Sequence, residues 1–246
     1  MTDYRYVIVG IGNLAWHLER MLIASGANPV MMNSGMNANS SPAASFESMD
    51  LHDSIVFLTV RDAFIGSMAN HFRKAFLVHC SGGMPLNVLP KNRSAVLWPL
   101  QTFTKGVEMK YDHIPFIIES ENPWLREELV LRFSPVSDKV VAMNSEMRRK
   151  VHLAAVVAQN FSNRMIAEAD MILCGTGYDY TLLLPLLSES LRKLEWVNPI
   201  DAQTGPAVRS DFEVLNSHLK MCDGDEGLKE LYRLISERIN PLFKHE

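Results

Sequence analysis

The sequence predicts an α/β fold, in which a Rossmann-like doubly wound, mostly parallel sheet is followed by an all-α C-terminal domain. Three observations support this class. A short apolar run at residues 7–9 leads directly into a glycine-rich turn, and further short apolar runs alternate with helical stretches. After about residue 144 the pattern becomes helical. We therefore expect two domains, at residues 1–142 and 143–246.

The first turn matches the G-x-G-x-x-A pattern of dinucleotide-binding loops. Gly10 permits a tight turn, Gly12 leaves room for a pyrophosphate beside the backbone, and Ala15 lets a helix pack closely on the strand. The helix that begins at Leu14 directs the positive end of its dipole toward the phosphates. The pattern predicts a dinucleotide site, and a structural turn of similar sequence is the alternative.

Short apolar runs mark the remaining strands of the sheet, with a helical stretch at 61–71 between two of them. We expect these strands at 29–32, 55–60, 75–79, 95–97 and 114–119. In open sheets of this kind, ligands bind beyond the carboxyl ends of the strands. The predicted cofactor contacts are therefore Gly10, Ile11, Gly12, Asn13, Leu14, Asn33, Ser34, Val60 and Ser81.

The C-terminal region reads as a series of helices. A pattern without Gly or Pro covers 145–173, and three further helices are expected at 179–193, 205–218 and 225–239. Pro185 is expected to kink or break the second of these four helices.

The residues after the second strand favour NADP over NAD. An NAD-specific site usually has Asp or Glu here to bind the ribose 2′-hydroxyl, whereas this chain has Asn33 and Ser34, and no acid follows before Glu47. However, no Lys or Arg lies between Arg20 and Arg61 to bind a 2′-phosphate. NADP is the predicted cofactor, and NAD is the alternative.

The long helical pattern carries a line of polar residues. His152, Gln159 and Asn163 are seven and eleven positions apart, so at 100° per residue they lie along one side of a regular α-helix. His152 could donate or accept a proton, or it could be a structural histidine.

Two other segments carry candidate site residues. Arg209 could bind a substrate carboxylate, or it could pair with Asp211. Ser81 lies in a turn that could approach the nicotinamide, and its alternative role is to cap that turn. Gln101 follows the strand at 95–97, at the same expected edge of the sheet.

Composition narrows the range of partners. With a net charge of −4 and no basic run longer than 148–150, the chain of 246 residues gives no support to a nucleic-acid partner. No apolar run approaches the roughly 20 residues needed to cross a bilayer, so we expect a cytoplasmic protein without a membrane segment. The cysteines and histidines are scattered and predict neither a disulfide framework nor a metal site.

Five motifs together carry a family resemblance over nearly the whole chain. They are V-G-x-G-N, H-C-S-G, W-P-L-Q-T-F, H-L-A-A-V-V-A-Q-N-F and G-P-A-V-R-S-D. The chain resembles a family of NADP oxidoreductases with a Rossmann-like domain and a helical C-terminal domain of poorly defined function. This family is distantly related to pyrroline-5-carboxylate reductase and 6-phosphogluconate dehydrogenase.

The resemblance implies a substrate cleft between the domains, dimerisation through the helices, and His152, Asn160 and Arg209 as cleft residues. The chain departs from the family pattern at two positions. Trp98 stands where His commonly precedes P-L-Q-T-F, and Ser210 stands where the last motif commonly has Gly.

We therefore expect an oxidoreductase that transfers a hydride between NADP and a small carbonyl or imine metabolite. The predicted catalytic residues are His152, Asn160 and Arg209, and the predicted substrate contacts are Gln159, Gln101 and Asp211. The protein is expected to form a homodimer. A non-catalytic protein that senses NADP or a metabolite is the alternative, because the family histidine is replaced by Trp98.

Overall fold

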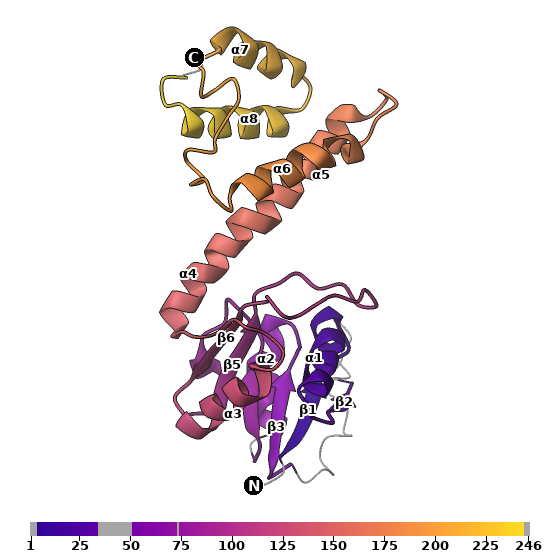
Figure 1. Ribbon diagram of the computed structural model, residues 1–246, viewed down its shortest axis with the longest axis vertical. Coiled ribbons are helices and arrows are strands. Elements are labelled where there is room, and N and C mark those ends of the chain that lie inside the picture. Colours follow the sequence, from indigo (N-terminus) through magenta and orange to yellow (C-terminus); the bar gives the residue numbers. More distant parts are fainter. Residues whose placement is uncertain (1–3, 34–50, 73, 244–246) are drawn as a thin grey trace. The chain divides into compact units, whose positions relative to one another are not determined.

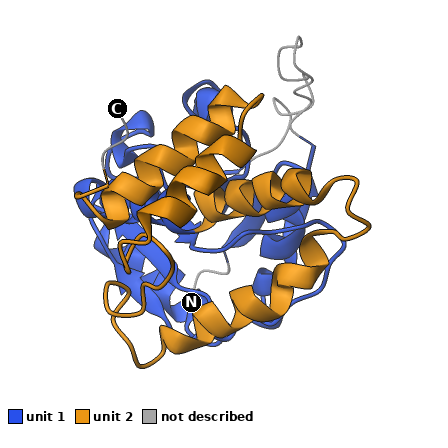
Figure 2. Ribbon diagram, turned by 90° about the horizontal axis from the view of Figure 1, so that it is seen from above, with its two compact units in different colours: residues 1–158 blue, residues 159–246 orange. Residues whose placement is uncertain are grey.

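The computed structural model describes residues 4–33, 51–72 and 74–243. The chain divides into two compact units, residues 1–158 and residues 159–246, which Figure 2 shows in blue and orange. Each unit has its own cluster of buried apolar side chains.

The first unit is built on one seven-stranded sheet with the order β2-β1-β3-β4-β5-β6-β7. The strands are β1 (Arg5–Val9), β2 (Val30–Met32), β3 (Ser54–Leu58), β4 (Phe76–His79), β5 (Ser94–Pro99), β6 (Phe116–Ser120) and β7 (Val140–Ala142). Neighbouring strands run parallel except β5 and β6, which are antiparallel. The predicted fold class, a mostly parallel Rossmann-like sheet, is confirmed.

Helices cover both faces of this sheet. On one face, α1 (Asn13–Ala24) and α3 (Pro123–Phe133) bury apolar side chains in a shared core with β1 and β3, and Figure 1 shows both helices beside the strands. On the other face lies α2 (Ile65–Ala69). Short 3₁₀ turns occur at η2 (Asp62–Phe64), η3 (Asn70–Phe72) and η4 (Leu86–Val88). A sheet buried on both faces explains why its central strands read as continuous apolar runs.

Helix α4 (Ser145–Ala155) belongs to the first unit. The domain boundary expected from the sequence, between residues 142 and 143, places this helix in the helical domain instead. Its Arg148 is fully buried and forms a salt bridge with Glu119 of β6. Its Val151 packs against the cluster that contains Trp98. Both contacts join α4 to the sheet, although the sequence pattern of α4 resembles that of the helices that follow.

The second unit is helical. After the π-helical segment η5 (Val156–Phe161), in which the unit begins, come α5 (Ser162–Leu173), η6 (Tyr180–Leu183), α6 (Leu184–Lys193), α7 (Phe212–Met221) and α8 (Glu226–Ile239). Pro185 lies in the first turn of α6, where its missing N–H costs nothing, so the predicted helix over 179–193 is divided there.

The prediction of a helix from residue 205 is wrong. Helix α7 begins at Phe212, because Ser210 has a φ of +59°, a left-handed conformation that an α-helix cannot contain. No helix among the described residues is both long and apolar enough to span a membrane.

Candidate functional site

Gly10 lies at the point where the sheet changes its direction of winding. Strand β1 pairs with β2 on one side and with β3 on the other, so the ends of β1 and β3 flank the crevice in which such sheets bind ligands. Gly10 has a φ of +139°, and a Cβ added to it would lie 2.4 Å from Thr59 Oγ1 and 2.7 Å from the Thr59 carbonyl oxygen. Only glycine fits this position.

Gly12 lies beside open space. A Cβ at this position would meet no atom within 4 Å, so the space beside the loop is open. Gly12 is also the N-cap of α1, and no side chain caps the first turn, which contains no acidic residue. The backbone N–H groups of Asn13 and Leu14 therefore begin a helix whose positive end is available to an anion. These features fit the pyrophosphate of a dinucleotide.

The other predicted cofactor residues lie at or near strand ends. Asn33 is exposed after β2, and Val60 follows β3. Ser34 lies outside the described residues. Asn13 accepts a hydrogen bond from the backbone N–H of Lys105 at 3.2 Å, so its side chain holds a neighbouring segment.

Ser81 caps the turn after β4. Its hydroxyl accepts hydrogen bonds from the backbone N–H groups of Gly83 and Met84, at 3.2 and 3.0 Å. It donates to Asp62 Oδ2 at 2.9 Å. The capping role considered for Ser81 is thus present. Gln101 is exposed, and its side chain accepts a hydrogen bond from the backbone N–H of Thr102.

Gly82 packs against two rings at the carboxyl edge of the sheet. A Cβ at Gly82 would lie 2.6 Å from His152 Cδ2 and 2.6 Å from Trp98 Cε2. The two rings pack edge to face, with centroids 5.5 Å apart. Among the described residues, no side chain or backbone group hydrogen-bonds either nitrogen of His152. The imidazole is therefore oriented by packing, and its nitrogens are left for a ligand or water.

The turn that holds Gly82 is fixed by Arg148, which the sequence analysis did not single out. The guanidinium donates to the carbonyl oxygens of Ser81 and Gly82 at 2.9 and 2.8 Å. It also donates to Glu119 Oε2 through Nε and Nη2, at 3.1 and 2.9 Å. Ser145 donates to the other oxygen of Glu119 at 2.6 Å. Arg148 thereby ties α4, which carries His152, to the turn beside it.

Two buried groups next to this turn have shifted pKa values. Burial, and secondly the charge of Arg148, lower the pKa of His79 to about 4, so His79 is neutral near neutral pH. Its Nδ1 accepts the N–H of Ser81 at 3.2 Å. Burial raises the pKa of the Cys80 thiol to about 12, which keeps it protonated and unsuited to nucleophilic attack.

The remaining predicted site residues belong to the second unit. Gln159 and Asn160 are exposed in η5, which is π-helical, so the regular 100° per residue on which the alignment of His152 with Gln159 was predicted does not apply to this segment. Arg209 is exposed and donates to Asp211 Oδ2 at 2.9 Å, which is the pairing considered as its alternative role.

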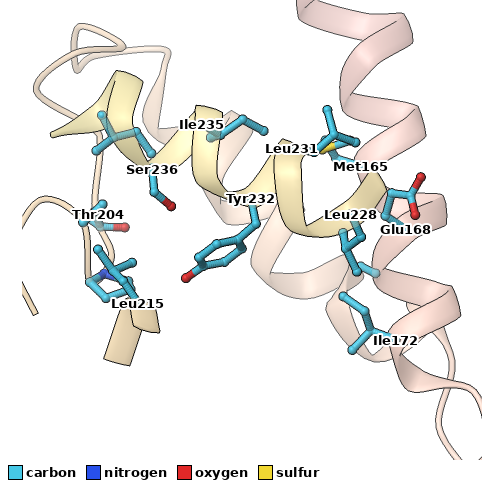
Figure 3. A pocket seen from close by; sticks show the side chains of 14 residues that line it. Met165, Glu168, Ile172, Thr204, Leu215, Leu228, Leu231, Tyr232, Ile235 and Ser236 are labelled. Atoms are coloured by element: carbon cyan, nitrogen blue, oxygen red, sulfur yellow. The ribbon is translucent and has the colours of Figure 1, made fainter. Parts of the chain in front are cut away.

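The second unit also contains a pocket of about 280 Å³ between α5, α7 and α8 (Figure 3). Its walls are mainly apolar, with Leu228, Leu231 and Ile235 among the lining residues. Tyr232 also lines it, and its hydroxyl is bonded to His218 Nδ1 at 2.7 Å. None of the predicted catalytic or substrate residues lines this pocket. In the described ranges, no group of three His, Cys, Asp or Glu side chains could hold a metal ion.

Arg148→Met is expected to lower the free energy of unfolding by about 3 kcal/mol, because it leaves the Glu119 carboxylate, whose side chain is only 13% exposed, without its charged partner. Urea unfolding measures this loss. The exposed neighbour supplies the control, and Arg149→Met should change stability by less than about 0.5 kcal/mol. Equal effects of the two substitutions would contradict the anchoring role of Arg148.

Acid is expected to destabilise the first unit through His79. In the unfolded chain His79 takes up a proton near pH 6.5, whereas the folded chain resists protonation until about pH 4. The contribution of neutral His79 to the free energy of unfolding is therefore fully present above about pH 6.5 and is lost as the pH falls toward 4. Between pH 7 and pH 5 the loss should be about 2 kcal/mol. Urea unfolding of His79→Asn, which keeps an acceptor for Ser81, should lack this component, and an unchanged pH dependence would disprove it.

Solved structures of similar fold match nearly the whole chain. A candidate NADP oxidoreductase of Bacteroides fragilis is 29% identical, covers 98% of this chain and 99% of its own, and has a TM-score of 0.86. Protein TM1727 of Thermotoga maritima is 22% identical over 95% of this chain and 96% of its own, with a TM-score of 0.69. Pyrroline carboxylate reductase of Plasmodium falciparum, solved with NADP bound, is 12% identical over 95% of this chain and 100% of its own, with a TM-score of 0.58.

These similarities confirm the resemblance inferred from the motifs. Among curated proteins, no sequence matches the chain. The family model described as "Domain of unknown function (DUF2520)" matches residues 114–239, which is just over half of the chain. The match begins at the approach to β6, includes α4 and ends with α8. The chain therefore belongs to the DUF2520 family.

Proposed function

We propose that this protein is an oxidoreductase that binds NADP at the loop containing Gly10 and Gly12 and either reduces a small carbonyl or imine metabolite or forms it by oxidising the corresponding alcohol or amine. One observation carries the proposal. The open glycine loop and the His152 imidazole, whose nitrogens are unbonded among the described residues, both belong to the carboxyl edge of the same sheet. This is the edge at which parallel sheets bind ligands.

The choice of NADP rests on the end of β2 and on proteins of similar fold. Asn33 follows β2 where an NAD-specific site usually has a carboxylate that repels the 2′-phosphate. The Plasmodium enzyme was solved with NADP. The proposed cofactor contacts are Gly10, Ile11, Gly12, Asn13, Leu14, Asn33, Ser34, Val60 and Ser81. NAD is the alternative cofactor.

The bound nicotinamide supplies or accepts the hydride. His152 exchanges the accompanying proton with the carbonyl oxygen or imine nitrogen, which balances the reaction. Trp98 and Gly82 hold the imidazole in one orientation through packing. The remaining proposed substrate contacts are Gln101, Gln159, Asn160, Arg209 and Asp211, of which Arg209 binds an anionic group of the substrate.

Titration of the purified protein with NADPH and NADH tests the cofactor assignment. Calorimetry and nicotinamide fluorescence should show tighter binding of NADPH than of NADH. A panel of small carbonyl and imine compounds should then consume NADPH. The absence of binding would contradict the proposal. Binding without turnover of any compound would favour the sensing function instead.

His152→Gln is expected to lower kcat about 100-fold or more with an identified substrate, because it removes the proton-exchanging group. The dissociation constant of NADPH should stay within about threefold of wild type. His113→Gln is the control, since the His113 side chain is exposed and its Nδ1 lies 3.1 Å from Asp138 Oδ2. Unchanged turnover in the His152 variant would exclude this role.

A matched pair of glycine variants tests the role of His152 without changing its imidazole ring. Gly82→Ala places a methyl group 2.6 Å from the rings of His152 and Trp98, so it should displace the imidazole and lower kcat. Gly83→Ala places a methyl group at an ordinary 3.6 Å from His152 and should be tolerated. If both variants retain full turnover, the orientation of His152 is not important for catalysis.

We also propose that two copies associate through the helical unit. The buried apolar core of this unit consists of Ala207, Leu215, Leu219 and Phe243. Helix α6 exposes Leu186 to 66% and Leu191 to 70%, an apolar surface that a second copy would cover. Sedimentation velocity should give the mass of two chains, and Leu191→Glu should shift the protein toward monomer. A wild-type monomer at micromolar concentration would contradict this assembly.

A further inference from the structure

Residues 100–113, which connect β5 to β6, are fastened to helix α1 by one buried histidine. His17 of α1 has no exposed surface. Its Nε2 lies 3.0 Å from the carbonyl oxygen of Thr104, and its Nδ1 lies 2.9 Å from the hydroxyl of Tyr111. Because a carbonyl can only accept, Nε2 of His17 carries a proton and donates to Thr104, and in a neutral ring Nδ1 then accepts from the Tyr111 hydroxyl. The 100–113 segment is thus held on both sides of Lys105.

Lys105 extends from this segment to the glycine loop. Its ammonium donates to the carbonyl oxygen of Ile11 at 3.1 Å, and its backbone N–H donates to Asn13 Oδ1 at 3.2 Å. Ile11 stands between Gly10 and Gly12 in the sequence. Three residues of α1 and its preceding loop, His17, Ile11 and Asn13, therefore determine where the ammonium lies.

The charge of Lys105 is not neutralised. In the ranges 4–33, 51–72 and 74–243, no carboxylate forms a salt bridge with it. The carbonyl oxygen of Ile11 occupies one of the three N–H donors of the ammonium. The ammonium also lies beside the start of α1, whose uncapped N–H groups form the positive end of the helix dipole. Two positive groups next to each other repel, and an anion between them removes that repulsion.

We propose that Lys105 binds the pyrophosphate of the dinucleotide, an inference that rests on the proposed function. The ammonium and the N-terminal N–H groups of α1 would contact the same anion from two elements that are about 90 residues apart in the chain. No Lys or Arg lies between Arg5 and Arg20 in the sequence, so Lys105 would supply a cation that the residues around the glycine loop do not.

The position of Lys105 distinguishes the pyrophosphate from the 2′-phosphate. In this type of fold the pyrophosphate lies at the glycine loop, whereas the ribose 2′-position lies near the residue after the second strand, here Asn33. Lys105 hydrogen-bonds to the glycine loop. It should therefore strengthen the binding of NADPH and NADH by the same factor.

Calorimetric titration of Lys105→Met with NADPH and with NADH tests this proposal. Loss of one charged contact should weaken the binding of both dinucleotides about tenfold or more, with little change in their ratio. Lys105→Arg, which keeps the charge, should recover most of the affinity. Lys110→Met is the matched control, because Lys110 is an exposed lysine of the same segment, and it should bind both dinucleotides like wild type.

Each other outcome has a distinct meaning. Wild-type affinity of the Lys105→Met variant for both dinucleotides would overturn the proposal while leaving the cofactor assignment intact. Weaker binding of NADPH alone would also overturn it, because that result assigns Lys105 to the 2′-phosphate. If Lys110→Met weakens the binding of both dinucleotides equally, the effect comes from the net charge of the protein and not from a contact of Lys105, and the proposal is overturned. If the wild type binds neither dinucleotide, the proposed function fails, and this inference fails with it.

Discussion

The arrangement of the candidate site depends on the burial of one charge, the guanidinium of Arg148. A fully buried guanidinium must have its N–H groups satisfied by oxygen atoms, because no water is present to replace them. Those oxygens come from Glu119 on β6 and from the carbonyls of Ser81 and Gly82 after β4. Hydrogen bonds are directional, whereas apolar packing alone would let α4 slide along the sheet. The distance of His152 from Gly82 therefore follows from the requirement to solvate Arg148.

The sheet could be predicted because its signal is local. Strands buried on both faces read as apolar runs, and each predicted run forms a strand to within two residues at either end. The antiparallel direction of β6 could not be predicted, since an apolar run has no direction. The short strand β7 is half exposed, and its apolar residues do not stand out. In the helical unit, the left-handed conformation of Ser210 could not be predicted, because serine, unlike glycine, rarely adopts a positive φ.

The candidate site was only partly predictable, because only part of it is formed by residues that are neighbours in the sequence. Gly10 and Gly12 form a contiguous motif, and the geometry of each matches the role inferred for it. Arg148 and Lys105 act on partners that lie 66 and 94 positions away along the chain. Nothing in the sequence near Arg148 distinguishes it from Arg149, which is exposed on the same helix. Only the fold shows which of the two adjacent arginines is buried.

The ring pair at Gly82 bears on the substitution at Trp98. The family pattern that the chain resembles has histidine at this position, and histidine can take up and release a proton. An indole N–H can only donate a hydrogen bond and does not exchange its proton near neutral pH. Trp98 is 9% exposed, and its ring packs edge to face against His152, with Gly82 beside both rings. In the proposed reaction Trp98 can therefore orient the imidazole but cannot replace it. Proton exchange at this edge of the sheet would fall to His152, because neighbouring His79 is buried and held neutral.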